Sequence, residues 1–165
     1  MTHLVVMGVA GCGKSVLARS IAARLGCDML EGDDFHLASS QDKMRQGIAL
    51  DDADREPWLQ LLGRQLAARD GDVVLACSSL KRKYRDLLRA ADPGLRFVYI
   101  DVDVYTAAQR VGSRAGHLFP TSLVASQFDS LEPPEGEAGV LAVSGLLPTG
   151  QQVEAVAGWL ALASL

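Results

Sequence analysis

The feature that most constrains the fold is the octapeptide at residues 8–15, which reads Gly-Val-Ala-Gly-Cys-Gly-Lys-Ser and matches the pattern G-x-x-x-x-G-K-[ST]. It follows an apolar run at residues 4–7, and apolar side chains recur at helical spacing over residues 16–25. A loop between a strand and a helix N-terminus gathers backbone N–H groups and the positive end of the helix dipole, both of which attract anions. The octapeptide is therefore predicted to bind phosphate, and a chance match in a glycine turn is the alternative.

Each type of residue in this loop has a predicted use. The glycines permit positive φ angles and a close approach of the backbone to a ligand. Lys14 can reach the β- and γ-phosphates of a nucleotide, and Ser15 can ligate Mg²⁺. We expect the nucleotide to contact Gly8, Val9, Ala10, Gly11, Cys12, Gly13, Lys14 and Ser15.

The composition excludes several classes of protein. The 165 residues fit a single domain, 1–165, and no apolar run approaches the roughly 18 residues that a membrane span needs. A net charge of −4 and a pI near 5.3 argue against a general nucleic-acid binder, which needs a basic face. The three cysteines lack metal-ligand spacing, and the phosphate loop begins too early for a secretion signal. We expect a cytoplasmic protein with reduced thiols that binds neither membrane nor nucleic acid.

Short apolar runs alternate with amphipathic segments along the chain. Strands are predicted at residues 4–7, 28–31, 73–76, 96–101 and 139–144. Helices are predicted at residues 15–25, 41–46, 80–91, 104–114, 121–131 and 151–162, and another begins among Asp51, Asp52 and Asp54 and ends at Gly71. This alternation implies parallel pairing and a three-layer α/β fold with a five-stranded parallel sheet.

An acidic turn, Gly-Asp-Asp-Phe-His at residues 32–36, follows the second predicted strand. The carboxyl ends of strands are where open α/β sheets place their chemistry. A carboxylate at Asp33, one strand from the phosphate loop, can accept a proton from a substrate hydroxyl or support a metal. An Asp/Gly turn with a helix cap explains the same residues equally well.

Basic residues occur in three further regions of the chain where an anion could be bound. Arg55 lies near a helix start, and Lys81 and Arg85 lie one turn apart after the third strand. Arg110 and Arg114 precede a segment rich in Gly and Pro, and they would neutralise phosphoryl charge at the root of a mobile lid. The alternative for each group is an ordinary solvated charge.

A phosphate loop alone fits an ATPase, a GTPase or a kinase. The sequence contains no Asn and so cannot carry the Asn-Lys-x-Asp motif that reads guanine. The long polar insert at about residues 34–70 and the lid at about residues 112–122 favour a small-molecule kinase, which closes over its substrate to exclude water.

From about residue 4 to residue 134 the chain resembles the gluconokinases of the small phosphate-loop type. Besides the loop itself, the resemblance is carried by Gly-Asp-Asp-Phe-His at 32–36, Lys-Met with a following Gly at 43–47, residues 50–59, Cys-Ser-Ser-Leu-Lys at 77–81 with Tyr-Arg-Asp at 84–86, Arg-Ala-Gly-His at 114–117, Ser-Gln-Phe at 126–128 and Leu-Glu-Pro at 131–133. Many kinases share the first stretch. The others together are specific to this family.

The resemblance implies a P-loop fold like that of the nucleoside-monophosphate kinases, and transfer of the ATP γ-phosphoryl group to the terminal hydroxyl of D-gluconate with Mg²⁺. It also implies a homodimer. Lys14, Asp33 and Arg114 would be catalytic, Ser15 and Asp33 would hold the metal with help from Asp34, and Arg110 would stack on adenine. The residues expected to bind gluconate are Asp33, His36, Arg55, Lys81, Arg85, His117 and Gln127.

Three positions depart from the family pattern. Leu37 and Ala49 stand where the family usually has Pro, and Ser40 stands where it has Asn. All three lie in the substrate-side insert. They keep open a kinase of another sugar acid or polyol, similar to shikimate kinase, beside gluconokinase itself. A nucleotide-binding regulator without catalysis is the third hypothesis, and retention of Lys14 and Asp33 argues against it.

Overall fold

The computed structural model describes residues 1–113 and 123–165. In this part of the chain five strands form one parallel sheet in the order β2-β3-β1-β4-β5. The strands are β1 (His3–Met7), β2 (Asp28–Glu31), β3 (Val73–Ala76), β4 (Arg96–Asp101) and β5 (Val140–Ser144). The predicted five-stranded α/β fold is confirmed.

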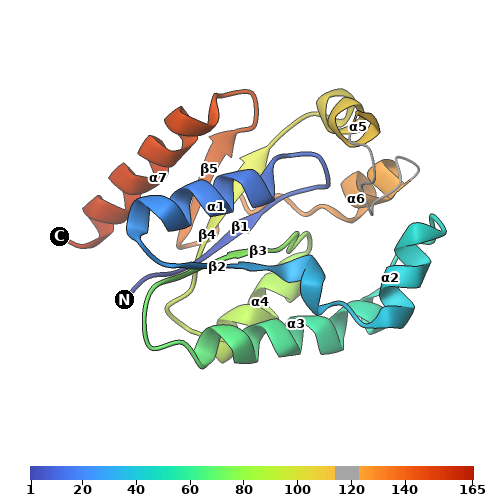
Figure 1. Cartoon of the computed structure of the whole chain (residues 1–165), viewed down its shortest axis with the longest axis horizontal. Helices are drawn as coiled ribbons and strands as arrows, with labels where there is room; N and C mark the ends of the chain where they lie inside the picture. The colour runs from blue at the N-terminus through green and yellow to red at the C-terminus, as the bar shows by residue number, and fades with distance from the viewer. Residues whose placement is uncertain (114–122) are drawn as a thin grey trace.

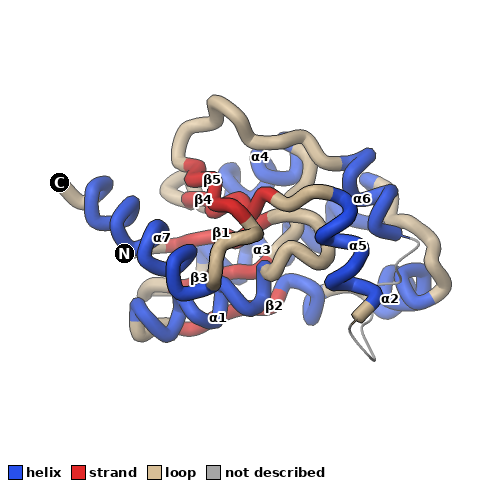
Figure 2. The backbone as a smooth tube through the Cα atoms, turned by 90° about the horizontal axis from the view of Figure 1, so that it is seen from above, coloured by secondary structure: helices blue, strands red, loops and turns tan. Residues whose placement is uncertain are grey.

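Helices cover both faces of the sheet, as Figure 1 shows, and the view in Figure 2 places the strands between the two helical layers. One layer contains α1 (Lys14–Leu25) and α7 (Thr149–Ala163), and the other contains α3 (Asp52–Ala67) and α4 (Arg82–Ala91). The short elements η1 (Gly32–Phe35), α2 (Ala38–Arg45), α5 (Val104–Gly112) and α6 (Val124–Ser130) lie toward the end of the sheet where the strands finish. Among the described residues, no helix is both long enough and apolar enough to cross a membrane.

The central strand β1 explains why the core has two halves. All five of its residues are buried, and successive side chains of a strand point to opposite faces. Leu4 and Val6 therefore pack in the cluster beneath α1 and α7, whereas Val5 packs in the cluster beneath α3 and α4. In the parallel register Val5 lies between Leu75 of β3 and Phe97 of β4, which belong to the same cluster. Burial on both faces is the reason these strands read as continuous apolar runs.

Several helix boundaries differ from the predicted ones. Asp51 is the N-cap of α3 and forms a reciprocal capping box with Asp54, which selects one of the three predicted caps. Lys81 is the N-cap of α4 and not part of the helix. The helix predicted over residues 104–114 ends at Gly112, and that predicted over 121–131 is described for Val124–Ser130. The predicted lid falls almost wholly on residues 114–122, outside the described residues.

Candidate active site

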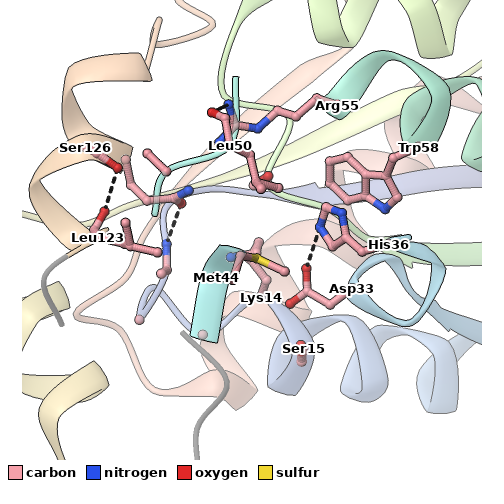
Figure 3. Close-up of a pocket in the computed structure, with 16 residues that line it drawn as sticks. Lys14, Ser15, Asp33, His36, Met44, Leu50, Arg55, Trp58, Leu123 and Ser126 are labelled. Atoms are coloured by element: carbon pink, nitrogen blue, oxygen red, sulfur yellow. Dashed lines mark hydrogen bonds and ion pairs between the residues drawn. The ribbon is translucent and has the colours of Figure 1, made fainter. Parts of the chain in front are cut away.

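A pocket opens at the carboxyl ends of β1, β2 and β3, where the phosphate loop, the η1 turn and the helices α3 and α6 converge (Figure 3). Its position agrees with the rule that open α/β sheets bind ligands at the carboxyl ends of their strands. The residues that line it are Ala10, Gly11, Gly13, Lys14, Ser15, Asp33, His36, Met44, Ala49, Leu50, Arg55, Trp58, Ser78, Leu123, Ser126 and Gln127.

The phosphate loop has the backbone geometry that its glycines were predicted to allow. Gly11 has a φ of 81°, and a Cβ there would lie 2.5 Å from the carbonyl oxygen of Ala107 in α5. Gly13 is the N-cap of α1 with a φ of 98°, and it offers no side chain to cap the helix. The first N–H groups of α1 therefore need another partner, which an anion in the loop would supply. Lys14 Nζ donates to the carbonyl oxygen of Val9 at 3.2 Å across the same loop.

Ser15 is held by an acidic residue that the sequence reasoning missed. The Ser15 hydroxyl donates to Glu31, the last residue of β2, at 2.5 Å. Burial raises the pKa of the Glu31 carboxyl above its ordinary value, the Ser15 hydrogen bond opposes this rise, and the nearby charge of Asp33 adds to it. The available signal was an acidic residue at a strand end two positions before Asp33. The structure thus adds Glu31 to the predicted site.

Asp33 and His36 lie together at the acceptor side of the pocket. The Asp33 carboxylate is 3.5 Å from His36 Nε2, and the Asp33 side chain is 64% exposed whereas that of His36 is only 4% exposed. The imidazole stacks on the indole of Trp58, with ring centroids 4.0 Å apart. His36 Nδ1 is buried and has no hydrogen-bond partner in the described part of the chain. A ligand hydroxyl or carboxylate would satisfy this atom.

Within residues 1–113 and 123–165, Arg55 is the arginine whose side chain lines the pocket. It is 8% exposed, donates to the carbonyl oxygen of Leu50 at 2.7 Å and lies 3.4 Å from the Tyr84 hydroxyl. Lys81 is not a lining residue, because its ammonium group donates to Asp52 at 3.1 Å beside the same tyrosine. Tyr84 also donates to Asp52.

The Asp52 carboxylate is the acceptor at the centre of this group. Hydrogen bonds from Lys83, Tyr84 and Lys81 hold the pKa of the Asp52 carboxyl well below its ordinary value. Asp52 is therefore ionised at neutral pH and fixes Lys81 beside the pocket, where the lysine has no direct contact with the cavity.

Arg85 is a correction to the predicted site. Its Nε and Nη2 atoms donate to Glu137 at 3.0 and 2.5 Å. Nη1 donates to the carbonyl oxygens of Ser79 and Leu80, and Nη2 also donates to that of Glu132. The arginine is 1% exposed, and a guanidinium has five N–H groups, all of which these acceptors occupy. It is a scaffold residue and cannot also bind the carboxylate of a substrate.

Two predicted residues connect other elements to the phosphate loop. Gln127 of α6 is buried at the pocket, and its Oε1 accepts from the backbone N–H of Ala10 at 3.1 Å. Arg110 of α5 lies outside the pocket lining, where it donates to the carbonyl oxygens of Cys12 at 3.2 Å and Gly145 at 2.8 Å. Both residues therefore hold the loop from its flanks. Arg114 and His117 lie outside the described residues.

Comparisons with known proteins agree with the fold. The family described as AAA domain matches residues 4–134. A gluconokinase of Gluconobacter oxydans is 46% identical over 146 residues, which cover 86% of this chain and 82% of that protein. The chain belongs to the gluconokinase family.

Solved structures extend the likeness over nearly the whole chain. The crystal structure of a gluconokinase from Sinorhizobium meliloti is 44% identical, has a TM-score of 0.89 and covers 99% of this chain and 94% of its own. A sugar kinase from Janibacter is 36% identical with a TM-score of 0.93, covering 99% of this chain and 96% of its own.

The three departures from the gluconokinase pattern have different surroundings. Ala49 is on the wall of the pocket. Leu37 is the N-cap of α2 and is 55% exposed, whereas Ser40 is buried within α2. Of the three, only Ala49 is in a position to change the shape of the cavity directly.

The protein supplies few metal ligands at this site. Among the described residues, no group of three or more His, Cys, Asp or Glu side chains is arranged to hold an ion. Mg²⁺ in phosphoryl-transfer enzymes usually binds one or two protein ligands together with substrate phosphates and water. Ser15 with the Glu31 carboxylate beside it fits this kind of site, in which the nucleotide completes the coordination.

Proposed function

We propose that the protein transfers the γ-phosphoryl group of ATP to the terminal hydroxyl of D-gluconate, giving 6-phosphogluconate. One observation carries the proposal, namely that a single pocket brings the phosphate loop together with a carboxylate, a buried imidazole and a guanidinium. The relatives named gluconokinases support the choice of gluconate, because this chain matches them over more than four fifths of its length.

In this proposal the donor half of the pocket binds ATP. Backbone N–H groups of residues 8–15 and the N-terminus of α1 bind the phosphates, and Lys14 moves from the Val9 carbonyl oxygen to the γ-phosphate. Mg²⁺, when bound, would neutralise phosphate charge; Ser15 and Asp33 would hold it, and the Glu31 carboxylate lies beside Ser15. Arg110 flanks the loop and stacks on adenine.

The acceptor half binds and orients gluconate. Asp33 accepts the proton of the terminal hydroxyl as that oxygen attacks the γ-phosphorus atom; the bond from this atom to the β–γ bridging oxygen breaks, and ADP leaves. Arg55 binds the carboxylate of the sugar acid, and Nδ1 of His36 and the side-chain amide of Gln127 bind its hydroxyls. The resemblance assigns Arg114 to the phosphoryl group and His117 to gluconate, and Lys81 adds positive charge beside the pocket.

A coupled assay with ATP and Mg²⁺ tests this function against its alternatives. D-gluconate is compared on one preparation with shikimate, glycerate, a set of polyols and nucleoside monophosphates. We expect kcat/KM to be highest with gluconate. A higher value with another acid or polyol would reassign the acceptor, and the position of Ala49 on the pocket wall gives that outcome a structural basis. Nucleotide binding without turnover of any acceptor would indicate a regulator.

A further inference from the structure

We propose that Trp58 is a positioning residue, which holds Asp33 and His36 in the arrangement that the phosphoryl acceptor requires. The proposal rests on the proposed function, because Asp33 matters only if a hydroxyl is phosphorylated here. Trp58 lies on α3, and both its indole hydrogen bond and its ring stack are made to the η1 turn that carries the acid and to the residue that ends this turn.

Trp58 binds the turn at both ends. Its indole Nε1 donates to the carbonyl oxygen of Gly32, the first residue of η1, at 2.8 Å. The face of the same indole stacks on His36, the residue that ends the turn, at an interplanar angle of 19°. Figure 3 shows the indole and imidazole rings side by side, with Asp33 below the imidazole. Asp33 therefore lies in the chain between Gly32 and His36, and the Trp58 side chain contacts both of these residues.

The turn needs such support from outside. The η1 segment is a single 3₁₀ turn of four residues, and this geometry forms poorer hydrogen bonds than an α-helix. Its N-cap, Glu31, makes no side-chain capping bond and is directed to Ser15. Gly32 packs so tightly against β3 that a Cβ would lie 2.5 Å from the Ala76 carbonyl oxygen. The start of the turn is therefore held by both the strand and the Trp58 hydrogen bond, and its end is held by the stack of His36 on Trp58 beside the packing of Phe35 against the core.

Trp58 is better suited to orient these groups than to react. Its only polar side-chain atom already donates to Gly32, and the residue is 3% exposed. It lies on a 16-residue helix that packs on the sheet, so its own position is well defined. Loss of the indole would leave Asp33 near the pocket with a poorly defined approach to the acceptor, and a displacement of about 1 Å can lower a rate by up to 10²-fold.

The test compares substitutions at the two tryptophans of the chain. Trp58→Phe retains a ring for the stack and loses the N–H, and Trp58→Leu loses both. Trp159→Phe and Trp159→Leu are matched controls on α7, which lies in the other helical layer. Steady-state kinetics are measured with ATP and gluconate varied separately, and circular dichroism and thermal unfolding confirm that each variant is folded.

We expect kcat to fall about tenfold in Trp58→Phe and up to about 100-fold in Trp58→Leu, with KM for gluconate raised and KM for ATP unchanged. The Trp159 variants should change thermal stability, but they should not raise KM for gluconate selectively over KM for ATP. Full kcat in a folded Trp58→Leu variant would overturn the proposal. Equal increases in both KM values would overturn it as well, because they indicate general loosening of the pocket.

A fluorescence measurement distinguishes failure of this proposal from failure of the proposed function. In the Trp159→Phe variant Trp58 is the sole tryptophan. We expect a His36→Gln substitution to change its emission without any ligand, because the stacked imidazole is removed. Unchanged emission would contradict the stack. If the wild-type chain shows no turnover with gluconate while the Trp58 emission still responds to His36→Gln, the proposed function fails, but the stacking of His36 on Trp58 is supported.

Discussion

At the scale of the residue, Asp33 is the side chain on which the proposed chemistry depends most. We predict that Asp33→Asn lowers kcat by about 10²- to 10⁴-fold, because the amide has nearly the same shape and cannot accept the proton of the attacking hydroxyl. ATP affinity should be almost unchanged, since the loop binds phosphate through backbone groups. Both quantities are measured by the coupled assay and by equilibrium titration with ATP.

The neighbouring acid provides the comparison for this prediction. Asp34 is exposed and is not among the residues that line the pocket, so Asp34→Asn should have a smaller effect. Near-normal kcat in Asp33→Asn would show that another group accepts the proton.

Glu137 is a second residue whose side chain has a large predicted effect, in this case on the stability of the fold. Burial by itself would raise the pKa of the Glu137 carboxyl, but hydrogen bonds from Arg85 and Arg89 outweigh burial and hold the pKa below its ordinary value. The Arg85 and Glu137 side chains are 1% and 4% exposed. We predict that Glu137→Gln lowers the free energy of unfolding by about 3–5 kcal/mol near neutral pH, because it leaves a buried guanidinium without its counter-charge.

The pH dependence of this effect has a definite sign. A carboxyl whose pKa is lowered by folding stabilises the protein above its unfolded pKa, about 4.3 for Glu, and this stabilisation is lost as the pH falls through the folded pKa. The difference between wild type and Glu137→Gln should therefore shrink in acid, as measured by urea denaturation over a pH series. Glu154→Gln, on an exposed ion pair with Arg24, is the control and should change stability little. A pH-independent difference would contradict the assignment.

At the scale of the element, α6 is connected to the phosphate loop by one hydrogen bond between Gln127 and Ala10. We predict that Gln127→Ala raises KM for ATP about five- to tenfold, because the buried N–H of Ala10 loses its acceptor and the loop loses its fixed shape. Steady-state kinetics with ATP as the varied substrate measure this effect.

A second buried glutamine provides the control for this experiment. Gln152 of α7 is also buried and donates to the Ser144 carbonyl oxygen at 2.9 Å, away from the pocket. Gln152→Ala should destabilise the protein without raising KM for ATP. Equal KM values in both alanine variants would show that α6 does not shape the loop.

At the scale of the whole molecule, nucleotide binding should stabilise the entire fold. The loop joins the central strand β1 to α1, so ATP bound there holds elements that unfolding separates. With Mg²⁺·ATP at 100 times its Kd, the expected stabilisation is about 2.7 kcal/mol, or roughly 5–10 °C in Tm for a chain of this size. Differential scanning fluorimetry measures the shift.

Lys14 provides the test of where the nucleotide binds. Lys14→Ala should have nearly the wild-type Tm without nucleotide, because among the described residues the Lys14 ammonium donates one hydrogen bond, to the Val9 carbonyl oxygen. Its Tm shift with ATP should be much smaller than that of the wild type. An undiminished shift would place the nucleotide away from this loop.

The sequence allowed the fold and the phosphate-loop side of the pocket to be predicted. Apolar runs buried on both faces, helical periodicity and the glycine pattern are local features, so β1, the loop and α1 follow directly from residues 3–25. The scaffold role of Arg85 was not predictable in this way, because its partner Glu137 is 52 residues away and only folding brings them together. The same reason explains why Glu31 and Trp58 were missed as parts of the site.

By itself, then, the sequence determined which functional residues follow each strand: a phosphate loop after the first strand, an acid after the second and basic residues after the third. Those assignments depend on covalent neighbours and local backbone conformation. Which cations face the cavity was decided by tertiary structure, since Arg55 lines the pocket whereas Asp52 fixes Lys81 outside it and Glu137 neutralises Arg85 in the interior. The physical reason is that a charge takes the partner that packing places beside it, and sequence spacing does not specify that partner.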